Sequence, residues 1–419
     1  MLDRKTPPPF NRSTSFTLLQ PSVVTLPNGV NIHFISGGKQ DVVKVDFFFN
    51  AGRWQEQAWG VSYFTSKLLT KGTKTKTSFE IAQRFDLFGA NIELIAGLDY
   101  VGVSLYALTK NLEPVLQLLL EVLTEANFPE KELQQSKSIY LQNLKVNNEK
   151  TSFQASKLIR KNIFSDVHPY GKELEEEDVI KLERGQLTDF YQTFFSDFQV
   201  IVSGKIDTDT QHLITTMVGA LTSVKKKEAV HVVGTSGEYR QYVKKADSVQ
   251  TSIRLGRKSI LRTHADYADV LFLNHILGGF FGSRLMKNIR EEKGLTYGIY
   301  SSLHAMKHDS YVVIGADVNS ENRDLAFQEI RNELKRLRTT EIGADELDTA
   351  RYHFIGSLQS EITTPFAHAE KLQSILWYGL HPQHYKRMIE RINVIRTEEL
   401  IGIASTYFNE DLFLEVAVG

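Results

Sequence analysis

Hydrophobic and polar residues follow two different periods along the first half of the chain. Runs rich in β-branched and aromatic residues, bounded by turn residues, predict strands at 43–50 and 198–204, a hairpin at 23–35 and two short strands within 91–108. Apolar residues spaced three and four apart predict helices at 59–71, 79–88, 112–123, 130–145 and 152–163. The pattern therefore predicts a fold that mixes helices with strands.

The second half of the chain repeats this order. Tyr100-Val101 and Tyr311-Val312 begin similar segments, each a strand, a polar turn at Thr109 or Ser320, and a helix. Residues 68–72 correspond in the same way to 275–279. Between the copies, 223–240 has the lysine and glycine content of a connector. We predict an α+β protein with an N-terminal half at 1–222, a linker at 223–240 and a C-terminal half at 241–419.

Composition narrows the class of protein. The 419 residues are 42% hydrophobic and 24% charged with a net charge of -1, so we expect a globular protein without a global field for nucleic acid. The absence of cysteine excludes disulfides, thiolate metal sites and cysteine nucleophiles. No window approaches the ~18 apolar residues of a membrane span. The first 16 residues lack an apolar leader, and we expect a cytoplasmic location and no membrane partner.

One predicted helix has the form of a metal site without the metal chemistry. The stretch 59–73, WGVSYFTSKLLTKGT, should end at Gly72, a common residue at helix C-termini. It resembles the active-site helix of the pitrilysin/insulinase family of zinc peptidases, whose HxxEH motif lies in a frame like G-L-x-H-F-x-E-H-x-L-x-K-G-T. Tyr63 and Lys67 occupy the two histidine positions, and Ser66 occupies the glutamate position. The frame residues that match are Gly60, Phe64, Leu69, Lys71, Gly72 and Thr73.

The same resemblance implies a further glutamate ligand about eighty residues downstream, where this chain has Asn143. None of the four residues suits zinc. A tyrosine with an ordinary pKa near ~10 resists ionisation, and asparagine is a weak neutral ligand. A lysine charge ~4 Å from a divalent ion is repelled by roughly 8 kcal/mol at an effective dielectric constant of ~20. We therefore predict no zinc and no other cofactor in this chain.

A second stretch, 281–297, has polar side chains that suit a functional site. Phe281, Leu285 and Ile289 predict one face of a helix that ends at Lys293-Gly294 before a strand at 295–303. The stretch resembles the family's R-x-x-x-x-x-x-Y motif, with Arg290 and Tyr297 at the two fixed positions. The resemblance implies that this pair faces the zinc site and stabilises the oxyanion at the scissile carbonyl. The structural alternative is that Arg290 pairs with Glu291 or another carboxylate of the helix and that Tyr297 simply packs.

Other candidate motifs give weaker evidence for a functional site. His304 and His308, and likewise His381 and His384, lack a flanking glutamate in metal-site spacing, so we expect surface histidines. Glycine-rich 278–282 has no phosphate context; close packing or a turn is expected, and a loop at the edge of a substrate chamber is the alternative. The acidic run 173–178 should begin a solvated helix. Nucleophile-elbow, phosphate-loop and dinucleotide fingerprints are absent.

The resemblance also implies an architecture and a partner. Family members pair two homologous halves, each an antiparallel sheet with helices on one face, and some enclose a chamber between two subunits. One subunit carries HxxEH and zinc, whereas its homologue lacks the motif and supplies the Arg/Tyr pair. We therefore predict a non-catalytic subunit of a heterodimeric zinc metallopeptidase that acts on peptides. A structural core subunit, as inactive homologues form in respiratory complexes, is the alternative; a hydrolase using unrecognised residues is the weakest hypothesis.

Overall fold

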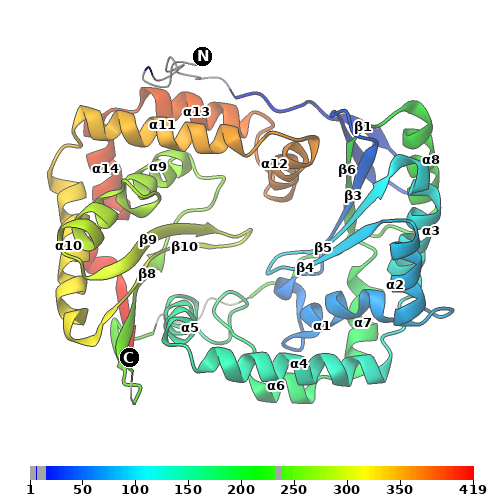
Figure 1. Ribbon diagram of the computed structural model, residues 1–419, viewed down its shortest axis with the longest axis horizontal. Coiled ribbons are helices and arrows are strands. Elements are labelled where there is room, and N and C mark those ends of the chain that lie inside the picture. The colour runs from blue at the N-terminus through cyan, green and yellow to red at the C-terminus, as the bar shows by residue number, and fades with distance from the viewer. Residues whose placement is uncertain (1–5, 7–15, 232–236, 247) are drawn as a thin grey trace.

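The computed structural model describes residues 6, 16–231, 237–246 and 248–419. Two β-sheets face each other across the middle of the molecule, and most helices cover their outer faces (Figure 1). The first sheet has the order β1-β2-β6-β3-β5-β4: β1 Ser22–Thr25, β2 Asn31–Ser36, β3 Val42–Phe49, β4 Asn91–Ala96, β5 Val101–Leu108 and β6 Phe198–Gly204. The second has the order β7-β11-β8-β10-β9: β7 Arg240–Val243, β8 Gln250–Lys258, β9 Thr296–Ala305, β10 Ser310–Asn319 and β11 Leu414–Val418.

The helices divide between the same two halves. Those before residue 220 are α1 Val61–Leu68, α2 Ser78–Leu87, α3 Leu112–Glu125, α4 Glu130–Asn148, α5 Thr151–Phe164, α6 Glu176–Lys181, α7 Arg184–Phe194 and α8 Thr208–Gly219. Those after it are α9 Tyr267–Gly278, α10 Arg323–Thr339, α11 Ala344–Ser360, α12 Pro365–Trp377, α13 His384–Val394 and α14 Thr397–Tyr407. The predicted helices and strands of the first half are confirmed to within a few residues.

The strand pairing confirms the predicted repeat. In the first sheet β6 lies parallel to β2 and antiparallel to β3, and in the second β11 lies parallel to β7 and antiparallel to β8. The series β3-β5-β4 and β8-β10-β9 are antiparallel in both. Short 3₁₀ turns at Thr109–Asn111 and Ser320–Asn322 lead into α3 and α10. The predicted domain limits remain predictions, and residues 232–236 of the predicted linker lie outside the described part.

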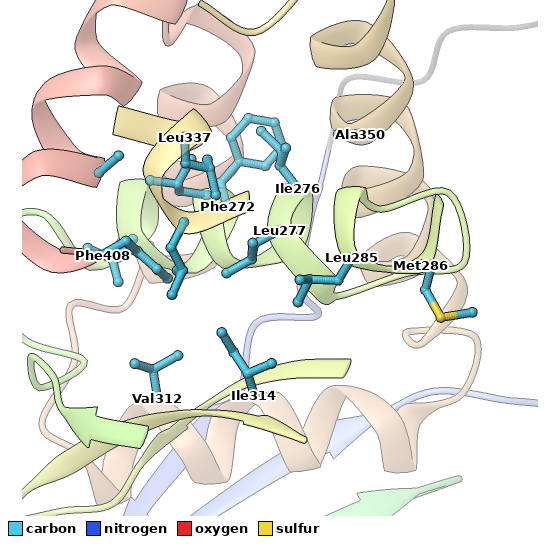
Figure 2. Packing of buried hydrophobic residues seen from close by; sticks show 14 of the residues in the cluster. Phe272, Ile276, Leu277, Leu285, Met286, Val312, Ile314, Leu337, Ala350 and Phe408 are labelled. Carbon is cyan, nitrogen blue, oxygen red and sulfur yellow. The ribbon is translucent and has the colours of Figure 1, made fainter. Parts of the chain in front are cut away.

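Each sheet builds a core between its outer face and its own helices. Figure 2 shows this core in the second half, where Ile276 and Leu277 of α9 lie above Val312 and Ile314 of β10. Val313, between those two, is on the opposite face because side chains alternate along a strand. The apolar area removed from water stabilises the fold by roughly 25 cal/mol per Å².

The inner face of each sheet is covered by a helix from the other half. Helix α12 packs on β2 and β6, where Trp377 and Ala369 contact Ile35 and Ile201. Helix α5 packs on β8 and β11 and contributes Ile159 and Ile163. The two helices occupy equivalent places in the repeat. Each half therefore contributes one helix to the inner face of the other half's sheet, an arrangement that we call the helix exchange.

Glycine permits one of these close approaches. A Cβ atom on Gly256 of β8 would lie 2.9 Å from Cγ1 of Ile159 and 3.0 Å from Cδ1 of Ile163. Contacts this short force the neighbouring chain to move. Gly256 therefore lets α5 approach the inner face of the second sheet.

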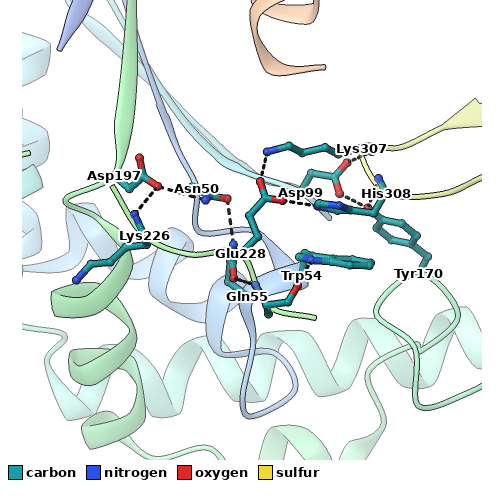
Figure 3. Close-up of polar contacts among 11 residues, drawn as sticks. Asn50, Trp54, Gln55, Asp99, Tyr170, Asp197, Lys226, Glu228, Lys307 and His308 are labelled. Carbon is teal, nitrogen blue, oxygen red and sulfur yellow. Dashed lines mark hydrogen bonds and ion pairs between the residues drawn. The ribbon is translucent and has the colours of Figure 1, made fainter. Parts of the chain in front are cut away.

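The two equivalent hairpin turns, at 97–100 and 306–309, meet in the middle of the molecule (Figure 3). The Asp99 carboxylate accepts hydrogen bonds from the Tyr170 hydroxyl and from the backbone N–H of Lys307, the latter at 3.0 Å. The same hydroxyl accepts from the backbone N–H of His308 at 3.3 Å. Trp54 stacks on His308 with 4.0 Å between ring centroids. We call these five residues the clasp.

The clasp corrects one prediction about the histidines. His308 is a partly buried stacking partner of Trp54, and His304 stacks on Tyr311 with 4.7 Å between ring centroids. The prediction of surface histidines holds for His304 and His381, which are exposed, and is wrong for His308 and His384, which are partly buried. His384 packs against Tyr267 and Tyr385.

The start of the predicted linker docks on the clasp. The Trp54 indole N–H donates to the Ala229 carbonyl at 2.9 Å, and His231 Nε2 lies 2.7 Å from the Trp54 carbonyl oxygen. The Ala229 backbone N–H donates to the Gln55 side chain at 3.0 Å. The segment up to residue 231 is thus tied to the middle of the molecule by specific hydrogen bonds.

Tyr170→Phe should lower the free energy of unfolding by about 1–3 kcal/mol, because it leaves the buried Asp99 carboxylate without its hydroxyl donor. Urea unfolding followed by circular dichroism measures this. Tyr407→Phe is the matched control: its hydroxyl donates to Asp266 at 2.6 Å near the surface, and the loss should be under about 1 kcal/mol. Equal losses in the two variants would contradict the role of the clasp.

Candidate functional site

Helix α1, the degenerate metal helix, is held at its N-terminus by a buried carboxylate. Glu56 accepts hydrogen bonds from the backbone N–H of Gly60 at 3.0 Å and of Ser62 at 2.9 Å. A carboxylate at this end also complements the helix dipole. Gly60 precedes the helix with a φ of 90°, a left-handed conformation that favours glycine. The first matching residue of the frame, Gly60, thus meets a structural requirement.

The helical run reaches its predicted end at Gly72, but its last turn is not α-helical. Helix α1 ends at Leu68, a 3₁₀ turn covers Leu69–Lys71, and the Gly72 backbone is extended. Glycine is needed there for packing, because a Cβ atom would lie 2.6 Å from Oδ1 of Asn127 and 2.8 Å from Cγ of Pro129.

The four positions that correspond to metal chemistry lie on α1 and α4. Tyr63 is half-buried and packs edge-on against Tyr140 of α4, with 5.2 Å between ring centroids. The Lys67 ammonium lies 6.0 Å from the centroid of the Tyr63 ring. Ser66 is fully buried, and its Oγ has no hydrogen-bond partner among the described residues. Asn143 is exposed on α4, one turn after Tyr140.

These donors do not fit a zinc ion. Burial raises the pKa of the Tyr63 hydroxyl above its ordinary value, which opposes formation of the phenolate ligand. Lys67 places a positive charge beside that ring. In the described ranges, no group of three or more His, Cys, Asp or Glu side chains is arranged to hold a metal ion. These four positions therefore do not form a zinc site in this chain.

Arg290 and Tyr297 lie on neighbouring elements of the second half. The segment Met286–Glu292 forms a π-helical stretch, labelled η4 here, which packs on β9. The Arg290 guanidinium lies 4.7 Å from the centroid of the Phe281 ring, a cation–π contact in place of the ion pair with Glu291. Tyr297, at the start of the edge strand β9, is 93% exposed. The alternative in which Tyr297 packs within this chain is therefore wrong.

Two features around this pair differ from expectation. Phe281 is 60% exposed, and its ring contacts the Arg290 guanidinium. It is therefore not on the buried helix face that its spacing predicted. The Arg290 and Tyr297 side chains are not joined by any contact between described residues. By contrast, Gly294 ends the helical stretch with a φ of 62°, as predicted.

The glycine-rich segment serves close packing. A Cβ atom on Gly278 would lie 2.6 Å from the backbone nitrogen of Ser301 in β9. Asn274, one turn earlier in α9, donates from Nδ2 to the Ser301 carbonyl at 3.0 Å. These contacts press the end of α9 onto β9 and support the packing interpretation of 278–282.

Sequence reasoning missed a cavity between the two halves. It has a volume of about 540 Å³, and its lining includes Arg53, Arg160, Arg262, Glu173 and His304. These residues come from distant segments and belong to no motif, so no sequence signal could have grouped them.

The acidic run beside this cavity is less solvated than predicted. Glu173 forms an ion pair with Arg160, Glu175 lies 2.6 Å from the Lys157 ammonium, and Asp178 lies 2.8 Å from that of Lys172. Helix α6 itself begins only at Glu176.

The triple variant Tyr63→His, Lys67→His and Asn143→Glu should bind about one zinc ion per chain, because it restores three good ligands at the predicted spacing. Mass spectrometry of dialysed protein measures the metal content, and the unmodified chain should hold none. The control places the glutamate one turn later, at Asn147, and should bind zinc at least about 10-fold more weakly. Stoichiometric zinc in the unmodified chain that is lost on Tyr63→Ala would contradict the prediction.

No helix in the described ranges combines the length and the apolar character that crossing a lipid bilayer requires.

Two family models match the chain in sequence. The model of the insulinase family, peptidase family M16, matches residues 34–176, and the model of the peptidase M16 inactive domain matches residues 181–352. Together they span the degenerate helix, the R-x-x-x-x-x-x-Y motif and most strands of both sheets.

Similar proteins extend over nearly the whole chain. The Bacillus subtilis (strain 168) "uncharacterized zinc protease YmxG" is 23% identical over 397 residues, covering 93% of this chain and 96% of that protein. The Helicobacter pylori "non-peptidase homolog YmxG" is 21% identical over 350 residues, covering 81% of this chain and 80% of that protein.

Solved structures agree on the fold. A peptidase M16 inactive domain from Pseudomonas fluorescens superposes with a TM-score of 0.88 at 23% identity, covering 96% of this chain and 98% of that one. A protease from Helicobacter pylori gives 0.85 at 18% identity, covering 96% and 100%. Likeness at this identity shows the architecture alone. The two family matches establish that this chain belongs to the insulinase (M16) family of peptidases. It is a member that lacks the HxxEH motif.

Proposed function

We propose that this chain is the non-catalytic subunit of a heterodimeric zinc metallopeptidase. In this proposal a homologous partner carries HxxEH, and this chain supplies Arg290 and Tyr297 to a peptide held between the two subunits. The observation that carries the proposal is the state of these two side chains. Tyr297 is 93% exposed and buries almost nothing within the chain, and Arg290 rests on an exposed phenylalanine ring.

Both side chains are suited to binding an amide under attack. A guanidinium donates several hydrogen bonds in a fixed plane, and a neutral phenol donates one. Phe281 holds the Arg290 side chain without neutralising its charge. In the partner, a bound zinc ion would supply the activated water. Arg290 and Tyr297 would stabilise the negative charge that develops on the carbonyl oxygen.

A structural core subunit is the second candidate. One observation favours it: neither Arg290 nor Tyr297 lines the cavity between the halves. Under that alternative the two exposed side chains contact another protein, and their loss weakens assembly without a specific effect on turnover. A cytoplasmic location for either assembly remains a prediction from the sequence.

Arg290→Ala should lower kcat of the reconstituted heterodimer by ~100–1,000-fold, because it removes a donor to the developing oxyanion. The measurement is cleavage of a fluorogenic peptide by the zinc-containing partner mixed with this chain. Tyr297→Phe, which loses only the hydroxyl, should lower kcat in the same direction.

Lys287→Ala is the matched control, since Lys287 is an exposed cation on the same helical stretch. It should leave kcat within about twofold. Size-exclusion chromatography reports assembly for every variant. Full activity with Arg290→Ala would contradict the proposed role, and weakened assembly with unchanged kcat would favour the structural core subunit.

A further inference from the structure

The cavity between the halves is assembled from both of them. Arg53 comes from the 3₁₀ turn Arg53–Gln55 before α1, and Arg160 comes from α5. The second half contributes Arg262, which follows β8, and His304 at the end of β9. The clasp closes one side, since Tyr170 is also part of the lining. The position of all these groups is therefore fixed by the packing of the two halves.

Positive charge exceeds negative charge in this lining. It holds three guanidinium groups and one carboxylate, Glu173, which pairs with Arg160. Arg53 donates instead to the Lys172 carbonyl at 2.8 Å. Arg262 donates to the Ala305 carbonyl at 3.1 Å and lies 4.4 Å from the centroid of the Tyr378 ring. Within the described residues, neither Arg53 nor Arg262 forms an ion pair with a carboxylate.

Carboxylates near the cavity are committed elsewhere. Glu56 is close enough to Arg53 for their charges to interact, but it caps α1, and burial raises its pKa to about 7. Asp99 is bound within the clasp by Tyr170 and Lys307 and does not line the cavity. Desolvation lowers the pKa of the His304 imidazole, which disfavours its charged form. The two arginines thus keep most of their charge available to a ligand.

The cavity also adjoins the degenerate metal helix. Arg53 and Glu173 both interact electrostatically with the Tyr140 hydroxyl, whose ring packs against Tyr63. A peptide that passes the face of α1 would therefore come within reach of Arg53. This arginine links the cavity to the degenerate metal helix.

We propose that this cavity binds a carboxylate of a peptide, either an acidic side chain or a C-terminal carboxylate, through Arg53 and Arg262. The inference rests on the proposed function in taking a peptide as the ligand. Guanidinium groups bind carboxylates through paired, charge-assisted hydrogen bonds, which gives geometric selectivity as well as affinity. The volume of about 540 Å³ accommodates a side chain with neighbouring backbone.

Fluorescence anisotropy on the isolated chain tests this with three labelled peptides of otherwise identical neutral sequence. The first has a central Glu and an amidated C-terminus, the second has Gln and an amidated C-terminus, and the third has Gln and a free C-terminal carboxylate. The first or the third should bind about 10–100-fold more tightly than the second. Which of the two binds more tightly identifies the source of the carboxylate.

Variants assign the effect to the cavity. Two variants should each remove most of the preference for the peptide that carries the recognised carboxylate: Arg53→Gln and Arg262→Gln. Glu173→Gln should strengthen binding, because it removes the one competing carboxylate from the lining and frees Arg160. Arg84→Gln, on the exposed surface of α2, removes the same charge elsewhere and should leave the preference unchanged. Circular dichroism melts verify that each variant is folded, and Glu173→Gln gives an informative gain if an arginine variant does not fold.

Equal affinity for the three peptides, or no binding of any of them up to about 1 mM, would overturn the proposal. So would an intact preference in the Arg53→Gln variant, or no gain with Glu173→Gln. These outcomes are distinguishable from failure of the proposed function, because binding is measured without the partner. A carboxylate preference together with full activity of Arg290→Ala in the heterodimer would leave the cavity site standing and refute only the oxyanion role.

Discussion

The structure depends on the reciprocal burial of two inner sheet faces. Each sheet has apolar side chains on both faces, but its own helices cover only the outer face. Helices α5 and α12 cover the inner sides by crossing to the opposite half, and the clasp joins the two turns between them. Neither half could separate without exposing both inner faces to water. The relative position of the halves, and hence of every candidate site residue, follows from this exchange.

This constraint explains why the metal helix keeps its frame after losing its chemistry. Phe64 and Leu69 are fully buried in the first core, and the Thr73 hydroxyl donates to Glu121 at 2.7 Å. These residues stabilise the packing of the first half. By contrast, Lys67 is exposed and Tyr63 is only half-buried, so these two side chains contribute less to the core. Loss of the ligands is therefore compatible with full retention of the architecture.

Local order could be predicted from the sequence, whereas contacts between distant segments could not. The strand β3, the helix α3 and the repeat of the two halves follow from periodicity over short windows. The exchange of α5 and α12 does not, because the same apolar faces would suit the parent sheet. The stacking of His308 on Trp54 and the grouping of Arg53 with Arg262 likewise depend on residues some two hundred positions apart. At the candidate site, the resemblance to the zinc-peptidase motif indicated the four ligand positions, but the support of Arg290 by Phe281 could not be foreseen.

The most direct test of the division of labour is a comparison of three samples at equal zinc concentration. They are this chain alone, a homologous subunit with intact HxxEH alone, and the two mixed, each assayed for peptide cleavage. If the labour is divided as proposed, cleavage in the mixture far exceeds the sum of the separate samples, and the zinc belongs to the partner. Cleavage at full rate by this chain alone, after removal of metal, would contradict it.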